Sequence, residues 1–356
     1  ARLARYEEEW EAGLAQALRT LRSVWDSVDE YLQVSRRNKV IAKGAYLLLL
    51  LLGIATTSIA TLIGTGTPPF DDDDVGGVGP STITALSLLT SFCIGIISFL
   101  APVQKWQQLR ATASQLESET WKFRTRTCHY ARIANGGRER ASDRQLIATA
   151  QLLRRGVIES ASIKDTSFFS VHAASTYRHG QRHDAIFEPR LRDDHYSVLR
   201  PDEYITLRVR PMLAFYKSRL PRYFRVRAAL QVAQLLTVVT TVVFSLIGWS
   251  AYATILAALV SSLTAWGEFY GANKKLARYS TVIAALHEEI SSWDALTEVE
   301  RHAAQRAEDL ISNCEALITG EREAWLATSP ASKNLEKALS SNADEKEDKA
   351  PAAPDR

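Results

Sequence analysis

Acidic residues at the edges of apolar segments are the groups in this sequence best suited to act on ions. Glu268 ends one apolar run, and four consecutive aspartates fall in a short loop between two others. In an oligomer, copies of Glu268 would form a ring that attracts cations. The aspartates would concentrate cations within about a Debye length, roughly 8 Å at physiological salt. An ion pair between Glu268 and Lys274 and a solvated loop are the structural alternatives. The aspartates are Asp71, Asp72, Asp73 and Asp74.

Small and polar side chains recur every three or four residues along two of the apolar runs. In lipid, such faces turn away from the acyl chains, either to pack closely against another helix or to line water. Comparable stripes in the two other apolar runs favour helix packing as the common cause. The candidates to line a pore are Thr84, Ser87, Ser91 and Ser98 in one run and Thr254, Ser261 and Glu268 in the other, and Gly95, Ala258 and Ala265 complete the two stripes.

The sequence contains no recognisable motif of an enzyme. A Ser/His/Asp constellation, a Walker loop, GxGxxG and HExxH are all absent, so we predict no catalytic residue and no cofactor. Four of the seven histidines, His172, His179, His183 and His195, cluster in one polar segment. Nearby aspartates would complete a metal site, but Gly180 argues against the helix that would align His179 with His183. We therefore interpret this segment as a solvated basic loop and predict no metal site.

Four apolar segments are long enough to be membrane spans. A helix rises about 1.5 Å per residue and must cross a hydrocarbon core of about 30 Å. The first two segments carry no charge, and the last two are separated by so few residues that they form a tight hairpin. The predicted spans are residues 44–63, 81–103, 228–249 and 251–267.

Lysine and arginine flank both pairs of spans on one side only. The loop at 65–80 contains four acids and no Lys or Arg. Because positive residues stay in the cytoplasm, we expect both termini there, with this loop and the turn near residue 250 on the opposite side. Such cations also touch anionic lipid headgroups. They are Arg36, Arg37, Lys39, Lys43, Lys105 and Arg110 around the first pair and Lys217, Arg219, Arg222, Arg225, Arg227, Lys274, Lys275 and Arg278 around the second.

Apolar residues continue at steps of three and four in the charged segments beside the spans. After the second span they are Trp106, Leu109, Ala113, Leu116, Thr120, Phe123, Thr127 and Tyr130. Similar seams precede the first pair of spans and follow the second pair. They predict long helices that leave the membrane and pack as a bundle with coiled-coil contacts.

The order of these elements predicts two repeats of helix, hairpin and helix, at residues 1–134 and 205–326. Residues 135–204 form a cytoplasmic insert with an amphipathic helix at 143–158. Residues 327–356 have few large apolar side chains and are predicted to be disordered. The expected fold class is an all-α membrane protein, with two transmembrane hairpins whose helices extend into a cytoplasmic bundle.

Three stretches resemble the SLATT superfamily of two-span membrane proteins, especially its tandem-repeat branch of unknown function. They are WQQLRATASQLESETWKF, DDHYSVLRPDEYITLRVRPMLAFY and CEALITGEREAW, and the resemblance covers roughly residues 1–326. It rests on patterned helices, through the Trp-x-x-Leu-Arg and Leu-Glu-x-Glu-x-Trp groups. It implies a membrane effector that forms pores and is linked, in bacterial members, to nucleotide-sensing conflict systems. This chain departs from the pattern by its two fused hairpins, its insert and the lack of a recognisable sensor domain.

These features together predict an oligomeric membrane pore or ion channel that prefers cations and is gated through its cytoplasmic bundle. Four spans without a charged relay do not easily enclose a water path alone, so the path is expected between copies. The expected partners are membrane lipid, further copies of the chain and inorganic ions. A net charge of +3 without a basic aromatic patch argues against nucleic acid. The alternative is a membrane-anchored coiled-coil scaffold or sensor without permeation, and a transporter is disfavoured because the spans lack interior charges.

Overall fold

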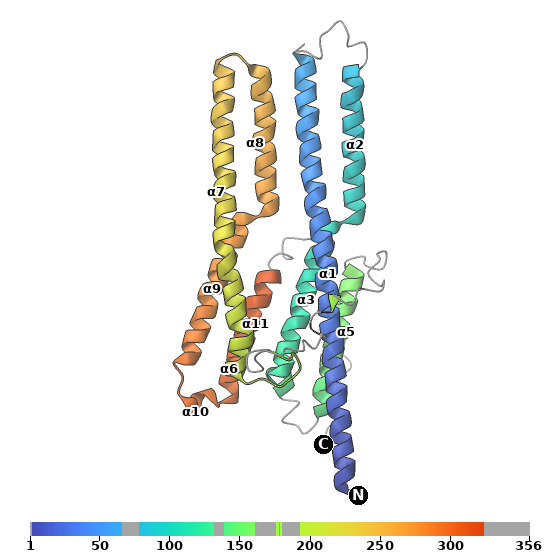
Figure 1. Cartoon of the computed structure of the whole chain (residues 1–356), viewed down its shortest axis with the longest axis vertical. Helices are drawn as coiled ribbons and strands as arrows, with labels where there is room; N and C mark the ends of the chain where they lie inside the picture. Colours follow the sequence, from blue (N-terminus) through green and yellow to red (C-terminus); the bar gives the residue numbers. More distant parts are fainter. Residues whose placement is uncertain are drawn as a thin grey trace, which may run out of the picture. The chain divides into compact units, whose positions relative to one another are not determined.

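The computed structural model describes residues 2–65, 78–131, 139–160, 176–177, 179 and 193–323. Within these ranges the chain forms helices joined by turns and has no strand (Figure 1), which confirms the predicted all-α fold class. The helices are α1 (Arg2–Gly64), α2 (Val78–Leu100), α3 (Pro102–Arg124), α5 (Glu139–Ser160), α6 (Pro201–Tyr204), the π-helical η4 (Ile205–Val209), α7 (Arg210–Leu246), α8 (Ser250–Tyr270), α9 (Ala272–Asp294), α10 (Glu298–Arg301) and α11 (Ala304–Glu323).

The chain divides into two compact units that do not follow the order of the sequence. The first, here called the bundle unit, comprises Ala1–Asn38, Val103–Leu213 and Val282–Arg356. The second, the membrane unit, comprises Lys39–Pro102 and Ala214–Thr281. Each predicted repeat therefore contributes helices to both units, and α1 and α7 each belong partly to one unit and partly to the other.

Four described helices are long and apolar enough to cross a membrane, as the sequence predicts. They are α2, α8 and the parts of α1 and α7 that belong to the membrane unit. Their large apolar side chains face outward: Phe92 is 66% exposed and Leu235 is 65% exposed. Such exposure would be costly in water and is expected where hydrocarbon is the solvent. The chain is therefore a membrane protein.

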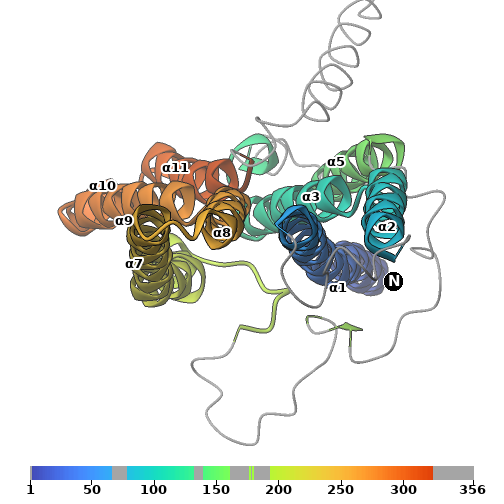
Figure 2. The same ribbon diagram turned by 90° about the horizontal axis from the view of Figure 1, so that it is seen from above.

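Within the membrane unit, α1 lies between α2 and α8, and α7 lies beyond α8 (Figures 1 and 2). The hydroxyl of Tyr46 on α1 donates a hydrogen bond of 3.1 Å to the carbonyl of Ala265 on α8. The Tyr46 ring also stacks on Phe269 with centroids 4.1 Å apart. Between α7 and α8, Gln234 Nε2 donates to Thr264 Oγ1 over 3.0 Å. Polar groups thus link helices that are otherwise apolar, and lipid strengthens the preference for such bonds.

The helix that leads into each hairpin is continuous, whereas the helix that leaves it breaks at the end of its span. After α2, Ala101 adopts a φ of +40°, and Pro102 begins α3. The right-handed helical region is disfavoured for a residue that precedes proline, which is consistent with a helix end at this position. After α8, Gly271 has a φ of +61°, the usual left-handed end of a helix. The second span therefore ends at Leu100, three residues before its predicted boundary.

The hairpin turn of the second pair also differs slightly from the prediction. The helix of the third span ends at Leu246 rather than at 249, because Gly248 turns the chain with a φ of +88°. The fourth helix starts at Ser250 and runs to Tyr270, three residues beyond its predicted end. Trp249 packs edge-on against Phe244 at 5.5 Å and closes the turn. Glycine at this position removes the steric penalty that a side chain would meet at positive φ.

The core of the bundle unit contains the predicted apolar seam. In both views α3 lies between α11 and the pair formed by α1 and α5 (Figures 1 and 2). From Leu109 to Tyr130, every seam residue is at most 5% exposed, and only Trp106 is less deeply buried. On α1, Trp25 and Val28 are also almost fully buried. Burying each such side chain contributes about 1.5–3 kcal/mol, so the seam is the main apolar core of this unit.

Candidate functional site

The pore-lining candidates of α2 lie on a face that the rest of the chain leaves uncovered. Thr84, Ser87, Ser91 and Ser98 are all exposed. The half-buried residues of the same helix, including Leu86, Thr90, Cys93 and Ile97, form a separate face. Gly95 belongs to the exposed stripe, and a Cβ placed on it would meet nothing within 4 Å. The small-residue stripe is therefore on the exposed surface of α2, where another molecule could reach it.

The candidates on α8 form a second exposed face, and the chain does not bring the two faces together. Thr254, Ser261 and Glu268 are exposed, whereas Ala258 and Ala265, predicted for the same stripe, are half-buried. Because α1 lies between α2 and α8, the two sets lie on opposite sides of α1 (Figure 2).

The hydroxyl groups of the α8 stripe already have hydrogen-bond partners in their own helix. Thr254 Oγ1 donates to the carbonyl of Ser250 over 3.0 Å, and Ser261 Oγ donates to that of Ala257 over 3.1 Å. Such bonds to the preceding turn satisfy the hydroxyl without water. Exposure of this stripe to lipid therefore carries little polar cost.

Glu268 lies beside the lysine that the sequence offered as its partner. Its carboxylate is 3.8 Å from Lys274 Nζ, and both side chains are 74% exposed. A pair as exposed as this contributes at most about 1 kcal/mol, so Glu268 remains accessible to ions. The four aspartates, Asp71, Asp72, Asp73 and Asp74, lie outside the described residues.

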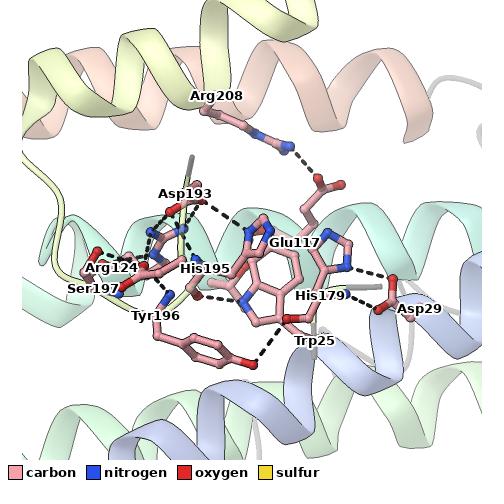
Figure 3. Close-up of polar contacts among 12 residues, drawn as sticks. Trp25, Asp29, Glu117, Arg124, His179, Asp193, His195, Tyr196, Ser197 and Arg208 are labelled. Atoms are coloured by element: carbon pink, nitrogen blue, oxygen red, sulfur yellow. Dashed lines mark hydrogen bonds and ion pairs between the residues drawn. The ribbon is translucent and has the colours of Figure 1, made fainter. Parts of the chain in front are cut away.

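A buried polar cluster in the bundle unit was not predicted from the sequence. It begins at Trp25 on α1, whose indole stacks on the His179 imidazole with centroids 4.4 Å apart (Figure 3). His195 packs edge-on against the same indole at 5.6 Å. The Asp29 carboxylate bonds His179 twice. His179 Nδ1 lies 2.7 Å from Asp29 Oδ1, and the backbone N–H of His179 donates to Asp29 Oδ2 over 2.9 Å. Instead of lying in a solvated basic loop, as predicted, these two histidines are half-buried, because the Trp25 ring offers an apolar surface that shields part of each ring.

Asp193 joins this histidine pair to helix α3. Arg124 Nη1 donates to Asp193 over 2.7 Å, and Arg124 Nη2 also bonds the same carboxylate. The Arg124 side chain is fully buried. Burial alone would raise the pKa of Asp193, but hydrogen bonds and charge from Arg124 and His195 hold it well below its usual value of 3.8. The pair is therefore ionised across the physiological range.

The backbone around His195 is fixed in an unusual conformation. His195 has a φ of +65°, which a residue with a side chain adopts at some cost. Its N–H donates to Asp193 Oδ1 over 3.1 Å, and its carbonyl accepts from Trp25 Nε1 over 3.0 Å. Arg124 Nε then donates to the carbonyl of Ser197 over 3.0 Å. These contacts fasten the segment at 193–197 to both α1 and α3.

A second buried charge cluster surrounds Arg208 in the π-helical segment η4. Arg208 is 3% exposed and bonds Glu315 of α11 through Nε over 3.0 Å and Glu117 of α3 through Nη1 over 2.5 Å. Tyr204 donates its hydroxyl to Glu315 over 2.9 Å. Burial alone would lower the pKa of Arg208, but the two glutamates raise it, so this guanidinium stays charged. One extra residue per turn in η4 places Arg208 between the two carboxylates, a role π-helical turns often have at functional sites.

Trp121 connects the two clusters. The Arg124 guanidinium lies 4.8 Å from its ring centroid and that of Arg208 lies 5.4 Å away. Trp25 packs edge-on against Trp121 at 6.5 Å. A continuous set of aromatic and charged side chains therefore runs from α1 through α3 to η4 and α11. We refer to it as the buried relay.

The buried relay joins α1, α3, η4 and α11 through paired charges and packed aromatic rings. Among the described residues, no group of three His, Cys, Asp or Glu side chains is arranged to hold a metal ion. The sequence shows the group of histidines and the apolar seam that contains Trp25. Their contacts could not be predicted from it, because they join residues more than 100 positions apart. Nothing in the spacing of Arg208 distinguishes it from the other arginines before the third span. His172 and His183 lie outside the described residues.

The two halves of the chain match different protein families. Residues 204–325 match SLATT_1, the SMODS and SLOG-associating 2TM effector domain 1. Residues 26–135 match a different family, DUF4231, described as a protein of unknown function. Neither the curated proteins nor the solved structures give a match. The predicted resemblance to the SLATT superfamily is thus confirmed over residues 204–325, where the chain matches its 2TM effector domain.

Proposed function

We propose that this protein is the subunit of an oligomeric membrane pore that conducts ions, prefers cations and is gated through the bundle unit. The observation that carries the proposal is the pair of polar faces on α2 and α8 that the chain leaves uncovered. Thr84, Ser87, Ser91 and Ser98 on α2 and Thr254, Ser261 and Glu268 on α8 are available to a neighbouring copy. No catalysis is part of this proposal.

The position of α1 supports a path between copies rather than within one. Since α1 lies between α2 and α8, the two polar faces belong to helices that are separated within one copy (Figure 2). A ring of copies would place α2 of one subunit or α8 of another along a common axis. Small residues such as Gly95 and Ser91 allow the close approach of helices that such a ring requires.

The same proposal places the membrane unit in the bilayer and the bundle unit in the cytoplasm. The cationic flanks of both hairpins favour a cytoplasmic bundle unit and cytoplasmic termini. Helices α1 and α7 each contribute residues to both units, so these two helices are the proposed route from the bundle to the spans. Membrane lipid, further copies of the chain and inorganic ions are the partners that this arrangement requires.

Ion flux in proteoliposomes containing the purified full chain tests the proposal. Vesicles loaded with a cation-sensitive dye should show flux that depends on protein, and Glu268→Gln should reduce the preference for cations over anions several-fold. Asp309→Asn removes an exposed acid from α11 of the bundle unit and serves as the charge-matched control. Absence of flux at all voltages and protein densities would refute the pore, and an unchanged selectivity in Glu268→Gln would remove Glu268 from it.

A scaffold or sensor without permeation is the second candidate, and one observation favours it. Thr254 and Ser261 bond carbonyls of their own helix, so their stripe does not need water to satisfy its hydroxyls. A membrane-anchored bundle that recruits a partner would use the same fold with its stripes packed helix against helix. Thiol-reagent access distinguishes the two: Ser91→Cys should react with a membrane-impermeant reagent if it lines water and stay protected if it packs.

A further inference from the structure

The membrane unit carries a large excess of positive charge outside the Asp71–Asp74 loop. Residues 39–64, 78–102 and 214–281 together contain ten Lys and Arg and one acid, Glu268. All ten cations flank apolar spans rather than lying within them. Such an excess needs counter-anions, and the membrane surface supplies them as lipid phosphates. The cations are Lys39, Lys43, Lys217, Arg219, Arg222, Arg225, Arg227, Lys274, Lys275 and Arg278.

Two of these lysines converge on one aromatic ring from different helices. Tyr270 ends α8, and Lys275 Nζ lies 4.5 Å from its ring centroid, with Lys43 Nζ of α1 5.4 Å from the same centroid. Lys275 also lies 5.5 Å from the Tyr223 ring of α7. We call these four residues the Tyr270 cradle. Ring faces attract ammonium groups, but two like charges on one ring repel each other, so an anion between them would stabilise the arrangement.

The surroundings of the cradle favour a lipid over a soluble anion. Phe224 is 59% exposed between the exposed Arg222 and Arg225. On α1, Val40 and Ile41 are 72% and 52% exposed, next to Lys39. Exposed apolar and cationic side chains in alternation are typical of the level where acyl chains meet headgroups. A free phosphate or an acidic peptide would leave these apolar side chains in water.

We propose that the Tyr270 cradle binds the phosphate of an anionic phospholipid, with Lys43 and Lys275 as the two cationic contacts and the two tyrosine rings as the wall of the site. The acyl chains then lie along the outward apolar faces of the spans. Because α1, α7, α8 and α9 all contribute residues, the bound lipid joins the first hairpin to the second. This proposal depends on the membrane location of the unit and not on the existence of a pore.

Native mass spectrometry of the full chain in neutral detergent tests the cradle. The probes are dioctanoyl phosphatidylglycerol, dioctanoyl phosphatidylcholine and inorganic phosphate at equal concentrations. The wild-type chain should bind phosphatidylglycerol at least about tenfold more tightly than phosphatidylcholine. The double variant Lys43→Gln, Lys275→Gln should lose about thirty-fold in affinity for phosphatidylglycerol, about fivefold for each lysine.

Two matched variants make the result decisive. Lys39→Gln with Lys217→Gln removes the same charge from the same unit outside the cradle, and its affinity should fall less than twofold. Lys43→Arg with Lys275→Arg keeps both charges and should retain selectivity, which also shows that the site tolerates substitution. Equal losses in the cradle and control variants would mean a general surface charge and overturn the proposal. Equal binding of the two lipids, or displacement of phosphatidylglycerol by inorganic phosphate at matched concentration, would overturn it as well.

Discussion

At the scale of single residues, the bundle unit depends on charges that are buried and paired. Arg124 and Arg208 are nearly inaccessible to water, and each bonds carboxylates contributed by other segments. Removing one partner of such a pair leaves an uncompensated buried charge and costs about 3–5 kcal/mol. Trp121 lies against both guanidiniums. A substitution at either end of the relay should therefore affect the stability of the whole unit.

Asp193→Asn should lower the thermal stability of the full chain at neutral pH by about 3 kcal/mol, because Arg124 loses its buried counter-charge. The pKa of Asp193 is lowered in the folded state, so its contribution is present above the usual value of 3.8 and is lost as the pH falls through the folded value. The difference between the wild type and Asp193→Asn should accordingly shrink below about pH 4. Thermal unfolding in neutral detergent from pH 3 to pH 8 measures both effects. A stability difference that does not change with pH would contradict the role of ionised Asp193 as the partner of Arg124.

Arg208→Met should destabilise the bundle unit by about 3–5 kcal/mol, since Glu315 is fully buried and would lose its cationic partner. Arg208→Lys should recover only part of this loss, because one ammonium cannot reproduce the bonds from Nε and Nη1 to two separate carboxylates. The exposed Arg210, two residues after Arg208, gives the matched control, and Arg210→Met should change stability by less than about 0.5 kcal/mol. Similar unfolding midpoints for the Arg208 and Arg210 variants would show that the Arg208 cluster contributes nothing to stability.

At the scale of elements, the two hairpins have the same construction. A continuous helix leads into each hairpin, and the outgoing helix breaks where its span ends. The two breaks differ in their residues: Ala101 adopts a positive φ before Pro102, a position where proline disfavours the helix, whereas Gly271 takes a left-handed conformation that glycine adopts readily.

Substitutions at the two breaks should shift stability in opposite directions. Ala101→Gly should raise the free energy of unfolding by about 0.5 kcal/mol, because glycine removes the left-handed strain although it makes the unfolded chain more flexible. Gly271→Ala should lower it by about 1–2 kcal/mol. The Cβ of the alanine would meet only the Glu268 carbonyl at 3.7 Å, so the cost is conformational and not steric. Melting temperatures of the two variants check the signs, and equal shifts would contradict this account of the breaks.

At the scale of the whole molecule, local patterns were predictable and long-range pairings were not. The seam from Leu109 to Tyr130 repeats every three or four residues, and its burial follows from the helical period. The spans follow from their length, and the Glu268–Lys274 contact joins residues close in the chain. By contrast, Asp29 and His179 are 150 positions apart, and Arg208 and Glu315 are 107 apart. No periodicity relates such residues, because their pairing depends on how complete helices dock.

The central claim is that copies of the chain close a ring through the polar faces of α2 and α8. The most direct measurement is the mass of the particle formed by the full chain in lipid nanodiscs, determined by native mass spectrometry. The account predicts a single closed oligomer, and it predicts that replacing Gly95 with Leu on the exposed face of α2 shifts the population toward monomers. A monomer in lipid at every protein concentration would contradict the ring and leave the scaffold as the remaining function.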